Sequence, residues 1–227
     1  EHLLRGTLAH AFFEAIGRGM DAEKAKLLVM EAFERIQDVP QWQLRFKLDE
    51  FSTLLDRARE WARQSEVNQE LAGVEIPVGV RVSEEVRIGG YMDRLLRDGE
   101  GNYLVVDLKT GRSKPAKKEG EDHVQLMTYQ LALAHGAFDG HQVHDGEGMP
   151  RQGGVLVYPG ATTKKIGEIW QSDKSPEALE EFAALLPPLV EEMRGPRITA
   201  RTNKDCDKCP IRSICPVQEE GRMTTDA

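Results

Sequence analysis

The chain is short of cysteine and of long apolar stretches, and each shortage disfavours a class of protein. Its three cysteines, Cys206, Cys209 and Cys215, all lie close to the C-terminal end of 227 residues. An odd, clustered set of this kind does not form a secreted disulfide framework, so we expect a metal site in a reducing, cytoplasmic compartment. No apolar run approaches the ~18 residues that a membrane helix needs, and the first residues lack a signal-peptide pattern.

Positive charge is also scarce. The chain has 30 Lys and Arg residues against 38 Asp and Glu residues, which gives a net charge of −8. Neutralising phosphates needs clustered Lys and Arg, so this balance disfavours a stand-alone DNA-binding protein. It leaves open a nuclease whose acidic residues hold metal and whose DNA is delivered from elsewhere. Two local basic stretches are present, Arg57–Arg63 and Arg112–Lys118, and such runs are often only solvated faces.

The first third of the chain predicts helices. Apolar residues at helical spacing indicate helices over Thr7–Gly17, Asp21–Gln37 and Pro40–Glu66, with Asp21 as the N-cap of the second. Some apolar residues of the last two helices are expected on their buried sides: Leu27, Leu28, Met30, Ala32, Phe33, Leu44, Phe46, Leu48, Phe51, Leu54, Leu55 and Trp61.

The rest of the chain predicts strands interleaved with helices. Alternating apolar residues indicate a strand over Val74–Val82, which Pro77 marks as an edge or a bend. Further strands are expected at Tyr91–Arg97, Tyr103–Lys109, Gly154–Tyr158 and Lys165–Gln171, and helices at Asp122–His135 and Pro176–Met193, the last interrupted by Pro187-Pro188. His141 and His144, in a glycine-rich loop, could ligate metal, although surface histidines are the simpler interpretation.

These elements predict an α/β fold with a mixed sheet of about five strands flanked by helices. We expect a single domain with a helical part (residues 1–66), a catalytic core (67–172), and a C-terminal helix with a cysteine-rich lobe (173–227). The opening residues resemble the interior of a structured region, so we expect the chain to be a piece of a longer polypeptide.

The segment Gly89–Gly111, GGYMDRLLRDGEGNYLVVDLKTG, carries the chemistry. If its two strands pair without a bulge around Asp98–Asn102, Arg97 faces Tyr103 and Asp93 faces Asp107. Two like charges directly opposed on neighbouring strands destabilise a sheet. Such a pair therefore indicates that a cation sits between the two carboxylates.

Lys109 adds a third charged group to the same strand face. It lies two residues after Asp107, so both side chains project from one side of the strand. Two carboxylates suit Mg²⁺ or Mn²⁺, and a water bound to the metal can attack a phosphodiester. Lysine can orient that water or neutralise charge on the phosphate. The alternative is that Asp107 and Lys109 form an ordinary salt bridge.

Four short motifs occur in the order found in RecB-like nucleases of the PD-(D/E)xK superfamily: GxxxH (Gly6–His10), GGYMD (Gly89–Asp93), DLKTG (Asp107–Gly111) and QLMTY (Gln125–Tyr129). The chain resembles these proteins over nearly its whole length. It is most similar to the C-terminal nuclease domains of bacterial helicase–nuclease subunits of the AddB and AdnB types. The resemblance implies a restriction-endonuclease-like core and a bacterial cytoplasmic protein.

The resemblance also implies roles for individual residues. His10, Asp93, Asp107 and the backbone carbonyl of Leu108 are metal ligands, and Gln125 and Tyr129 join Asp93, Asp107 and Lys109 in the catalytic set. Glu75 matches an acidic position often found on the strand before the metal hairpin. From the residues alone, His10 could be a packed core histidine, and Tyr129 could belong to the apolar stripe of its helix.

The cysteine spacing Cys206-x₂-Cys209-x₅-Cys215 resembles the C-terminal half of the iron–sulfur site in cluster-bearing members of this family. A [4Fe–4S] cluster takes four cysteines, so the fourth lies outside this sequence or another ligand replaces it. Zinc bound by three cysteines and a histidine such as His2 is the alternative. In either case the expected role is structural.

The sequence as a whole predicts a Mg²⁺- or Mn²⁺-dependent deoxyribonuclease that hydrolyses DNA ends or single strands. The family resemblance implies a helicase motor as partner, in the same chain or another subunit, and a role in recombination and double-strand-break repair. No membrane partner is expected. The alternative is a non-catalytic DNA-binding or structural module that keeps the nuclease fold and a metal site.

Overall fold

The computed structural model describes residues 2–114, 116–136, 148–161, 163–195 and 199–222. His141 and His144 lie outside these ranges. The chain divides into two compact units, Glu1–Ala183 and Ala184–Ala227, and each is described by itself. The expectation of one nuclease domain with three parts stays a prediction.

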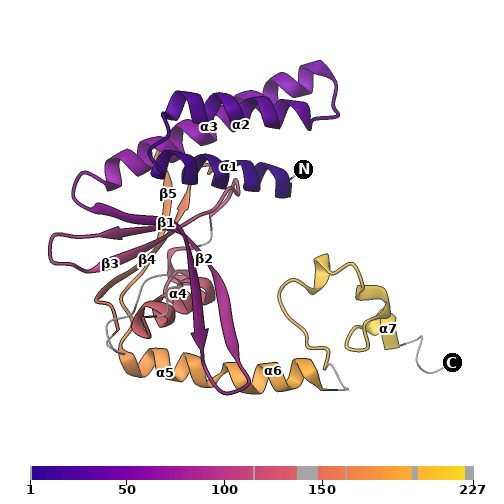
Figure 1. The fold of residues 1–227 in the computed structure, drawn as a ribbon. Coiled ribbons are helices and arrows are strands. Elements are labelled where there is room, and N and C mark those ends of the chain that lie inside the picture. Colours follow the sequence, from indigo (N-terminus) through magenta and orange to yellow (C-terminus); the bar gives the residue numbers. More distant parts are fainter. Residues whose placement is uncertain (1, 115, 137–147, 162, 196–198, 223–227) are drawn as a thin grey trace. The chain divides into compact units, whose positions relative to one another are not determined.

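A mixed sheet of five strands forms the centre of the first unit (Figure 1). The strands follow one another in sequence order across the sheet, and only β3 and β4 run parallel. The expected mixed five-strand sheet is therefore confirmed, and Pro77 lies in an edge strand as predicted. The strands are β1 (Glu70–Arg81), β2 (Arg87–Arg97), β3 (Tyr103–Leu108), β4 (Arg151–Tyr158) and β5 (Gly167–Gln171).

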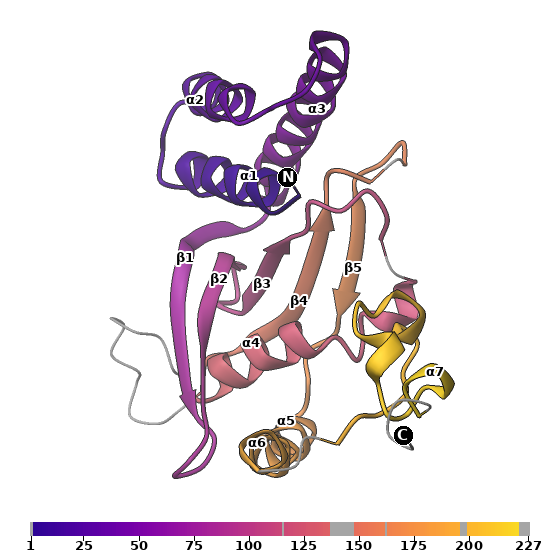
Figure 2. The same ribbon diagram turned by 90° about the vertical axis from the view of Figure 1, so that its right-hand side faces the viewer.

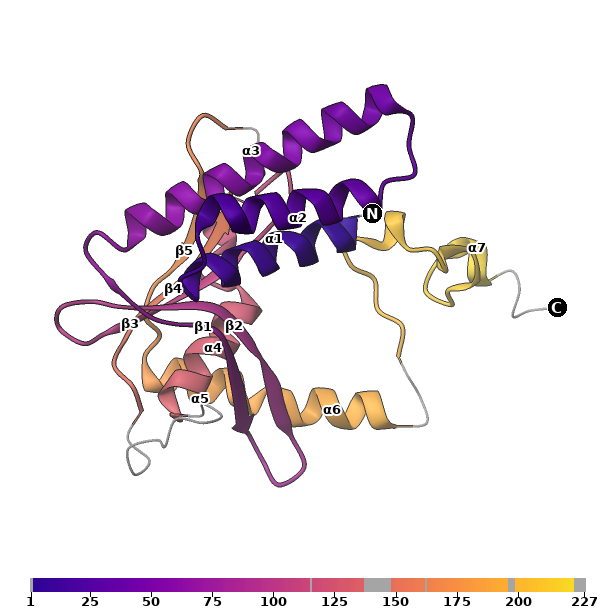
Figure 3. The same cartoon turned by 45° about the horizontal axis from the view of Figure 1, so that its top comes forward.

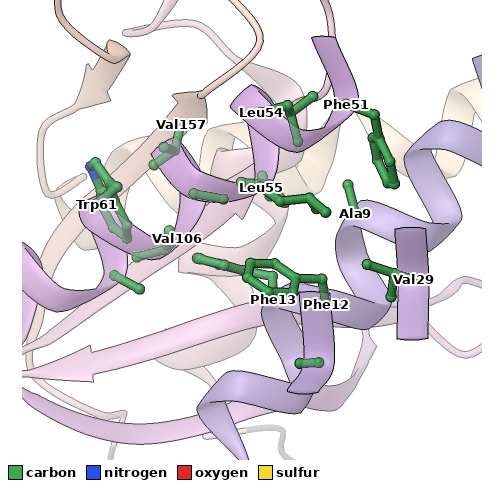
Figure 4. Close-up of a cluster of buried hydrophobic side chains, with 14 of the residues drawn as sticks. Ala9, Phe12, Phe13, Val29, Phe51, Leu54, Leu55, Trp61, Val106 and Val157 are labelled. Carbon is green, nitrogen blue, oxygen red and sulfur yellow. The ribbon is translucent and has the colours of Figure 1, made fainter. Parts of the chain in front are cut away.

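Three helices cover one face of the sheet: α1 (His2–Gly17), α2 (Ala22–Arg35) and α3 (Gln41–Ser65) (Figures 1 and 3). Their buried residues and those of the sheet form one apolar cluster that contains Phe12, Leu55 and Val106 (Figure 4). The carboxylate of Asp21 accepts a hydrogen bond from the Lys24 backbone N–H at 2.9 Å, which confirms the predicted N-cap.

The predicted buried side of α2 is partly wrong. Ala25, Val29 and Phe33, spaced four residues apart, face the core, whereas Leu27 and Leu28 are 68% and 50% exposed. A helix this short buries one narrow stripe, and the two leucines lie beside it. Phe46 of α3 is also exposed rather than buried.

The opposite face of the sheet carries α4 (Val124–Ala134), preceded by a short 3₁₀ turn at Lys117–Glu119 (Figure 2). Gln171 of β5 fixes the start of α4, because its side-chain amide donates to the carbonyls of Gly120, Glu121 and His123 at 3.0, 3.1 and 3.2 Å. Gln130 of α4 donates in turn to the Gln171 side-chain oxygen at 2.9 Å. Both glutamines are fully buried, so they hold α4 against the sheet.

The helix predicted over residues 176–193 is two helices, α5 (Pro176–Ala184) and α6 (Leu186–Arg194). The two prolines fall in the first turn of α6, where a missing N–H costs least. Beyond α6 the second unit consists of two 3₁₀ turns, Cys206–Lys208 and Arg212–Ile214, and α7 (Glu219–Arg222). Among the described helices, none is long and apolar enough to cross a membrane.

Candidate active site

The hairpin of β2 and β3 has the register expected from its loop. Arg97 pairs with Tyr103, and the ladder continues to Arg94 and Val106. One further step would place Asp93 opposite Asp107, but the described ladder stops before that step. Instead, Asp93 Oδ2 accepts a hydrogen bond from the backbone N–H of Leu108 at 2.6 Å. A buried carboxylate thus takes the place of a backbone acceptor where the two strands separate.

Asp93 is also the centre of a group of potential metal ligands. Its Oδ1 lies 3.1 Å from Nδ1 of His10, which α1 brings over the end of the hairpin. Glu75 of β1 completes the group, and one ligand atom of each residue lies within 4.8 Å of the others. Within the described parts of the chain, this is the one such set of three histidine, cysteine or acidic residues.

The backbone at Glu75 is strained. Its φ is +47°, the one positive value for a described residue other than glycine. The left-handed region is unfavourable for most side chains and is often found at functional sites, where the surrounding structure holds it. Glu75 lies between two regular pairs, Val74–Arg94 and Ile76–Met92, which supply that support. The sequence pointed to Glu75 only as an acidic position, and it contains no signal for this conformation.

Asp107 belongs to a second, adjoining group that involves α4. Its Oδ2 lies 2.7 Å from Nζ of Lys109, and its Oδ1 accepts a hydrogen bond from Gln125 Nε2 at 2.6 Å. Lys109 Nζ also donates to Gln125 Oε1 at 2.5 Å. Oδ2 is buried and has the lysine ammonium as its ion-pair partner. Both oxygens of Asp107 are therefore held by side chains of this second group.

Tyr129 joins the helix to the neighbouring strand. Its hydroxyl accepts from Gln125 Nε2 at 2.9 Å and donates to the backbone carbonyl of Tyr91 at 2.6 Å. Burial is the main reason why the pKa of Tyr129 rises to about 12, and the charge of Asp107 adds to it. The phenol therefore stays protonated and acts as a donor. The carbonyl of Tyr91 is a part of this arrangement that the sequence did not indicate.

The pKa of Asp107 is raised to about 6, mainly by burial and next by the nearby charge of Asp93, while Lys109 opposes the rise. Burial and Asp93 likewise raise the pKa of Glu75. For His10, burial is the largest influence and lowers the pKa, but the hydrogen bond to Asp93 and the nearby carboxylates outweigh it and raise the pKa. The three carboxylates thus concentrate negative charge at a buried site. A cation bound there would reduce the repulsion between them.

The donor set fits a divalent cation. Carboxylate oxygens are the ligands that Mg²⁺ and Mn²⁺ prefer, and an imidazole nitrogen is accepted by Mn²⁺ and other transition metals. His10, Glu75 and Asp93 offer these donors, and Asp107 is close enough for its charge to influence the pKa of His10. In a strand the N–H and C=O of one residue point to the same side, so the Leu108 carbonyl is directed toward β2, as its N–H is.

A buried arginine supports the site from the other side of β2. Arg94 is 1% exposed, and its guanidinium lies 2.6 Å from Glu66 and 4.3 Å from the ring centre of Phe13. Arg94 therefore ties β2 to α1 and to the end of α3. It follows Asp93 directly in sequence, so it holds β2 in place next to the metal group. Sequence reasoning missed Arg94, although a charged residue among the apolar residues of one strand was a usable signal.

The structure does not bring the three cysteines into a metal-ligand group. Cys206 begins the first 3₁₀ turn of the second unit, Cys209 follows that turn, Cys215 follows the second turn, and all three thiols are free. Among the described residues they do not form a set within 4.8 Å. The Sγ of Cys206 accepts a hydrogen bond from the backbone N–H of Asn203 at 3.2 Å. Neither the iron–sulfur nor the zinc expectation is supported by this arrangement.

Residues 1–216 match the family model of the PD-(D/E)XK nuclease superfamily. The chain belongs to the PD-(D/E)XK nuclease superfamily. Membership implies a nuclease, which hydrolyses DNA and uses divalent metal ions, and the mixed sheet has the restriction-endonuclease-like form expected of it. The match carries no evidence for the AddB or AdnB type in particular.

Other comparisons add little to this membership in the PD-(D/E)XK superfamily. Among curated proteins, none matches the chain. Among solved structures, the crystal structure of SSO0001 is similar over 78% of this chain and 73% of its own, with 20% identity and a TM-score of 0.41. A likeness of this strength carries no conclusion about activity.

In this superfamily member, the charge crowding at Asp107 predicts a dependence of stability on pH. Folding raises the pKa of Asp107 from 3.8 to about 6, so its stabilising effect is present below pH 3.8 and is lost as pH rises through 6. A shift of roughly two pKa units corresponds to about 3 kcal/mol, as an upper value. In EDTA at pH 8, we expect Asp107→Asn to raise the melting temperature, because asparagine removes the buried charge. At pH 5 the rise should be smaller, because much of the wild-type Asp107 is then protonated.

Thermal melting followed by circular dichroism checks this expectation. Adding Mn²⁺ at pH 8 should reverse the order, because the ion stabilises the wild type and not the variant. Asp56→Asn, at an exposed ion pair with Lys26, serves as the control and should change neither curve by more than a small amount. A variant that melts below the wild type in EDTA at pH 8 would contradict the charge-crowding argument.

Proposed function

We propose that the chain is a Mg²⁺- or Mn²⁺-dependent deoxyribonuclease that hydrolyses phosphodiester bonds of single-stranded DNA or DNA ends. The observation that carries the proposal is the pair of adjoining groups at the end of the β2–β3 hairpin. One group, His10, Glu75 and Asp93, offers metal donors, and the other, Asp107, Lys109 and Gln125, holds a lysine beside a carboxylate. Membership of the PD-(D/E)XK superfamily supports the same reaction class.

The metal ion would be held by Asp93, Asp107 and His10, with Glu75 and the Leu108 carbonyl as further donors. When bound, such an ion lowers the pKa of a coordinated water and polarises the phosphate. Asp93 is fixed for this task by its bond to the Leu108 N–H. Asp107 is fixed by Gln125, and a bound cation would offset the crowding of charge that raises the pKa of Asp107.

Lys109 would act on the phosphate and the attacking water. Its Nζ lies between Asp107 Oδ2 and Gln125 Oε1, which fix the direction of the ammonium group. An ammonium held in place stabilises the negative charge that builds on phosphate oxygens during attack. Gln125 and Tyr129 are positioning residues in this scheme, because they bind the side chains that react and anchor them to β2.

We further propose that the nuclease works with a helicase motor, as in bacterial helicase–nuclease enzymes of the AddB and AdnB types, in recombination and break repair in the cytoplasm. Two features support this finer assignment. The order of the four motifs matches that group, and the net charge of −8 suits a domain that receives its strand from a motor.

The direct test is cleavage of end-labelled single-stranded DNA by the purified chain. We expect products with Mn²⁺ or Mg²⁺ and none with EDTA. Blunt duplex should be cut more slowly than single strands. The control is the same preparation of Asp56→Asn, which should match the wild type. Absence of any metal-dependent cleavage by a folded preparation would refute the proposal.

We also propose a structural metal site in the second unit, with iron–sulfur favoured over zinc because of the spacing of Cys206, Cys209 and Cys215. Three cysteines leave one ligand to be supplied by another group. The chain purified without oxygen should contain iron and absorb visible light, and Cys209→Ser should lose both. If the protein contains zinc and no iron, the site is a zinc site and not a cluster. If it contains neither iron nor zinc, the proposal is refuted. Nuclease activity is expected to depend on Asp93 in every case.

A further inference from the structure

A groove on the helical side of the first unit has no role in the site described above. Its first part is a hollow of about 280 Å³ between the starts of α1 and α3, which lie at the same end of the three helices (Figure 3). A second hollow of about 300 Å³ adjoins it and shares the side chains of Arg5, Phe46, Glu50 and Arg112. The two hollows thus lie side by side, and together they are called the groove below.

Two aromatic side chains stand exposed in this groove. Trp42 and Phe46 are 73% and 60% exposed, and both line the first hollow. They are four residues apart on α3, so they lie on one face of the helix. Behind them the buried Phe33 forms the floor and packs on Phe51, with ring centres 4.3 Å apart. The exposed pair and the buried Phe33 therefore line the same hollow.

The charge of the groove differs in sign from that of the chain. The chain as a whole carries −8, but cations outnumber acids along the groove. The charged side chains that line it are Arg5, Lys47, Arg57 and Arg112, against Asp49 and Glu50. Glu50 and Arg112 form an ion pair at 2.5 Å and offset each other, and Arg5, Lys47 and Arg57 outnumber Asp49 among the remaining charged side chains. The Arg112 side chain is 58% exposed in that pair, so a phosphate can reach it. Exposed aromatic rings interleaved with cations are the pattern of a surface that binds single-stranded nucleic acid.

The groove begins where the catalytic strand ends. Gly160 lines its second part, and a Cβ at Gly160 would lie 3.0 Å from the carbonyl oxygen of Thr110 and 3.2 Å from that of Gly111. Thr110 follows Lys109 directly in sequence. On the other side, Gly6 of α1 passes close to the Thr110 hydroxyl. The second part of the groove therefore lies beside the segment that directly follows Lys109 in the chain.

We propose that this groove binds a segment of single-stranded DNA, with bases stacked on Trp42 and Phe46 and phosphates beside Arg112. The inference rests on the proposed function, because the bound strand is the one that the nuclease cuts. Unpaired bases are required, since bases in a duplex are already stacked on one another.

Binding is tested without cleavage, by fluorescence anisotropy of a labelled oligo-dT of about 15 nucleotides in EDTA. Trp42→Ala and Phe46→Ala should each weaken binding about tenfold, because stacking on one base is worth that much. Arg112→Gln should lower the slope of log Kd against log salt by about one unit. Trp170→Ala is the matched control, because Trp170 is a half-exposed tryptophan that does not line the groove, and it should bind as the wild type does.

Unchanged affinity in the Trp42 and Phe46 variants would overturn the proposal, and so would equal loss in the Trp170 control. Equal affinity for blunt duplex would overturn the stacking role. The side chains are mostly exposed, so melting temperatures should not change and loss of folding is not an explanation. If the chain binds DNA through Trp42 but cleaves none, the proposed nuclease function is refuted and the DNA-binding groove is retained. If the chain cleaves DNA but its binding does not depend on Trp42, the groove is refuted and the nuclease function is retained.

Discussion

Asp93→Asn is expected to abolish metal-dependent cleavage of single-stranded DNA, with a loss on the order of 10³-fold or more. Asp93 is the residue that the proposed metal group shares with the hairpin, because one oxygen faces His10 and the other accepts from the Leu108 N–H. Asparagine keeps an oxygen that can accept that bond, but it loses the negative charge that a cation requires. Initial rates over a range of Mn²⁺ concentrations, together with Mn²⁺ binding by calorimetry, measure both effects.

Asp56→Asn is the matched control for this variant, because it removes a carboxylate that is 55% exposed and pairs with Lys26 on the helical side. It should bind Mn²⁺ and cleave DNA like the wild type. The melting curve of the Asp93 variant should show a folded protein, since the side-chain oxygen of asparagine can still accept the hydrogen bond from the Leu108 N–H. Cleavage by the Asp93 variant at the wild-type rate under saturating Mn²⁺ would rule out this carboxylate as a ligand.

Lys109→Met is expected to slow cleavage by about 10²- to 10³-fold while leaving Mn²⁺ binding nearly intact. The reason is that Lys109 stabilises charge on the reacting phosphate and is not itself a ligand. Methionine keeps most of the side-chain length and apolar stem. The prediction is checked by kcat from single-turnover cleavage and by the Kd for Mn²⁺ from calorimetry, both at pH 8.

Lys174→Met provides the comparison for Lys109. Lys174 also forms a 2.7 Å ion pair, with Glu121, and its side chain is less exposed than that of Lys109. Loss of that pair should leave kcat unchanged, because the described contacts of these two side chains do not include the proposed metal ligands, Lys109 or Gln125. If Lys109→Met weakens Mn²⁺ binding as strongly as Asp93→Asn does, the lysine has a part in holding the metal and the assignment of its role is wrong.

The hairpin shows how much of the site was predictable. The loop Asp98–Asn102 is short and rich in turn residues, so it sets the register, and the expected facing of Arg97 and Tyr103 is confirmed. That register also brings Asp93 and Asp107 close together. It does not decide which groups they contact, because those partners come from distant elements. His10 arrives with α1 and Gln125 with α4.

Other features depended on three-dimensional packing and could not be predicted from local patterns. Leu27, Leu28 and Phe46 have the composition of core residues, yet the position of each helix on its neighbours leaves them exposed. The left-handed backbone of Glu75 is imposed by the strand pairs on both sides of it. The order and direction of the strands were predicted only as a mixed sheet, and the structure shows which pair is parallel.

The two buried glutamines that hold α4 against the sheet, Gln130 of α4 and Gln171 of β5, depend on each other. Two N–H groups of Gln171 serve three carbonyls, and the remaining oxygen of Gln171 is occupied by Gln130. A change at either position alone leaves buried polar groups without partners, which costs more than the lost bonds themselves. In a library randomised at both positions and selected for activity, functional clones should therefore carry compatible pairs. Clones with a replacement at only one of the two positions should be rare. The contacts that fix the start of α4, the helix that carries Gln125, would therefore change in evolution only when both positions change together.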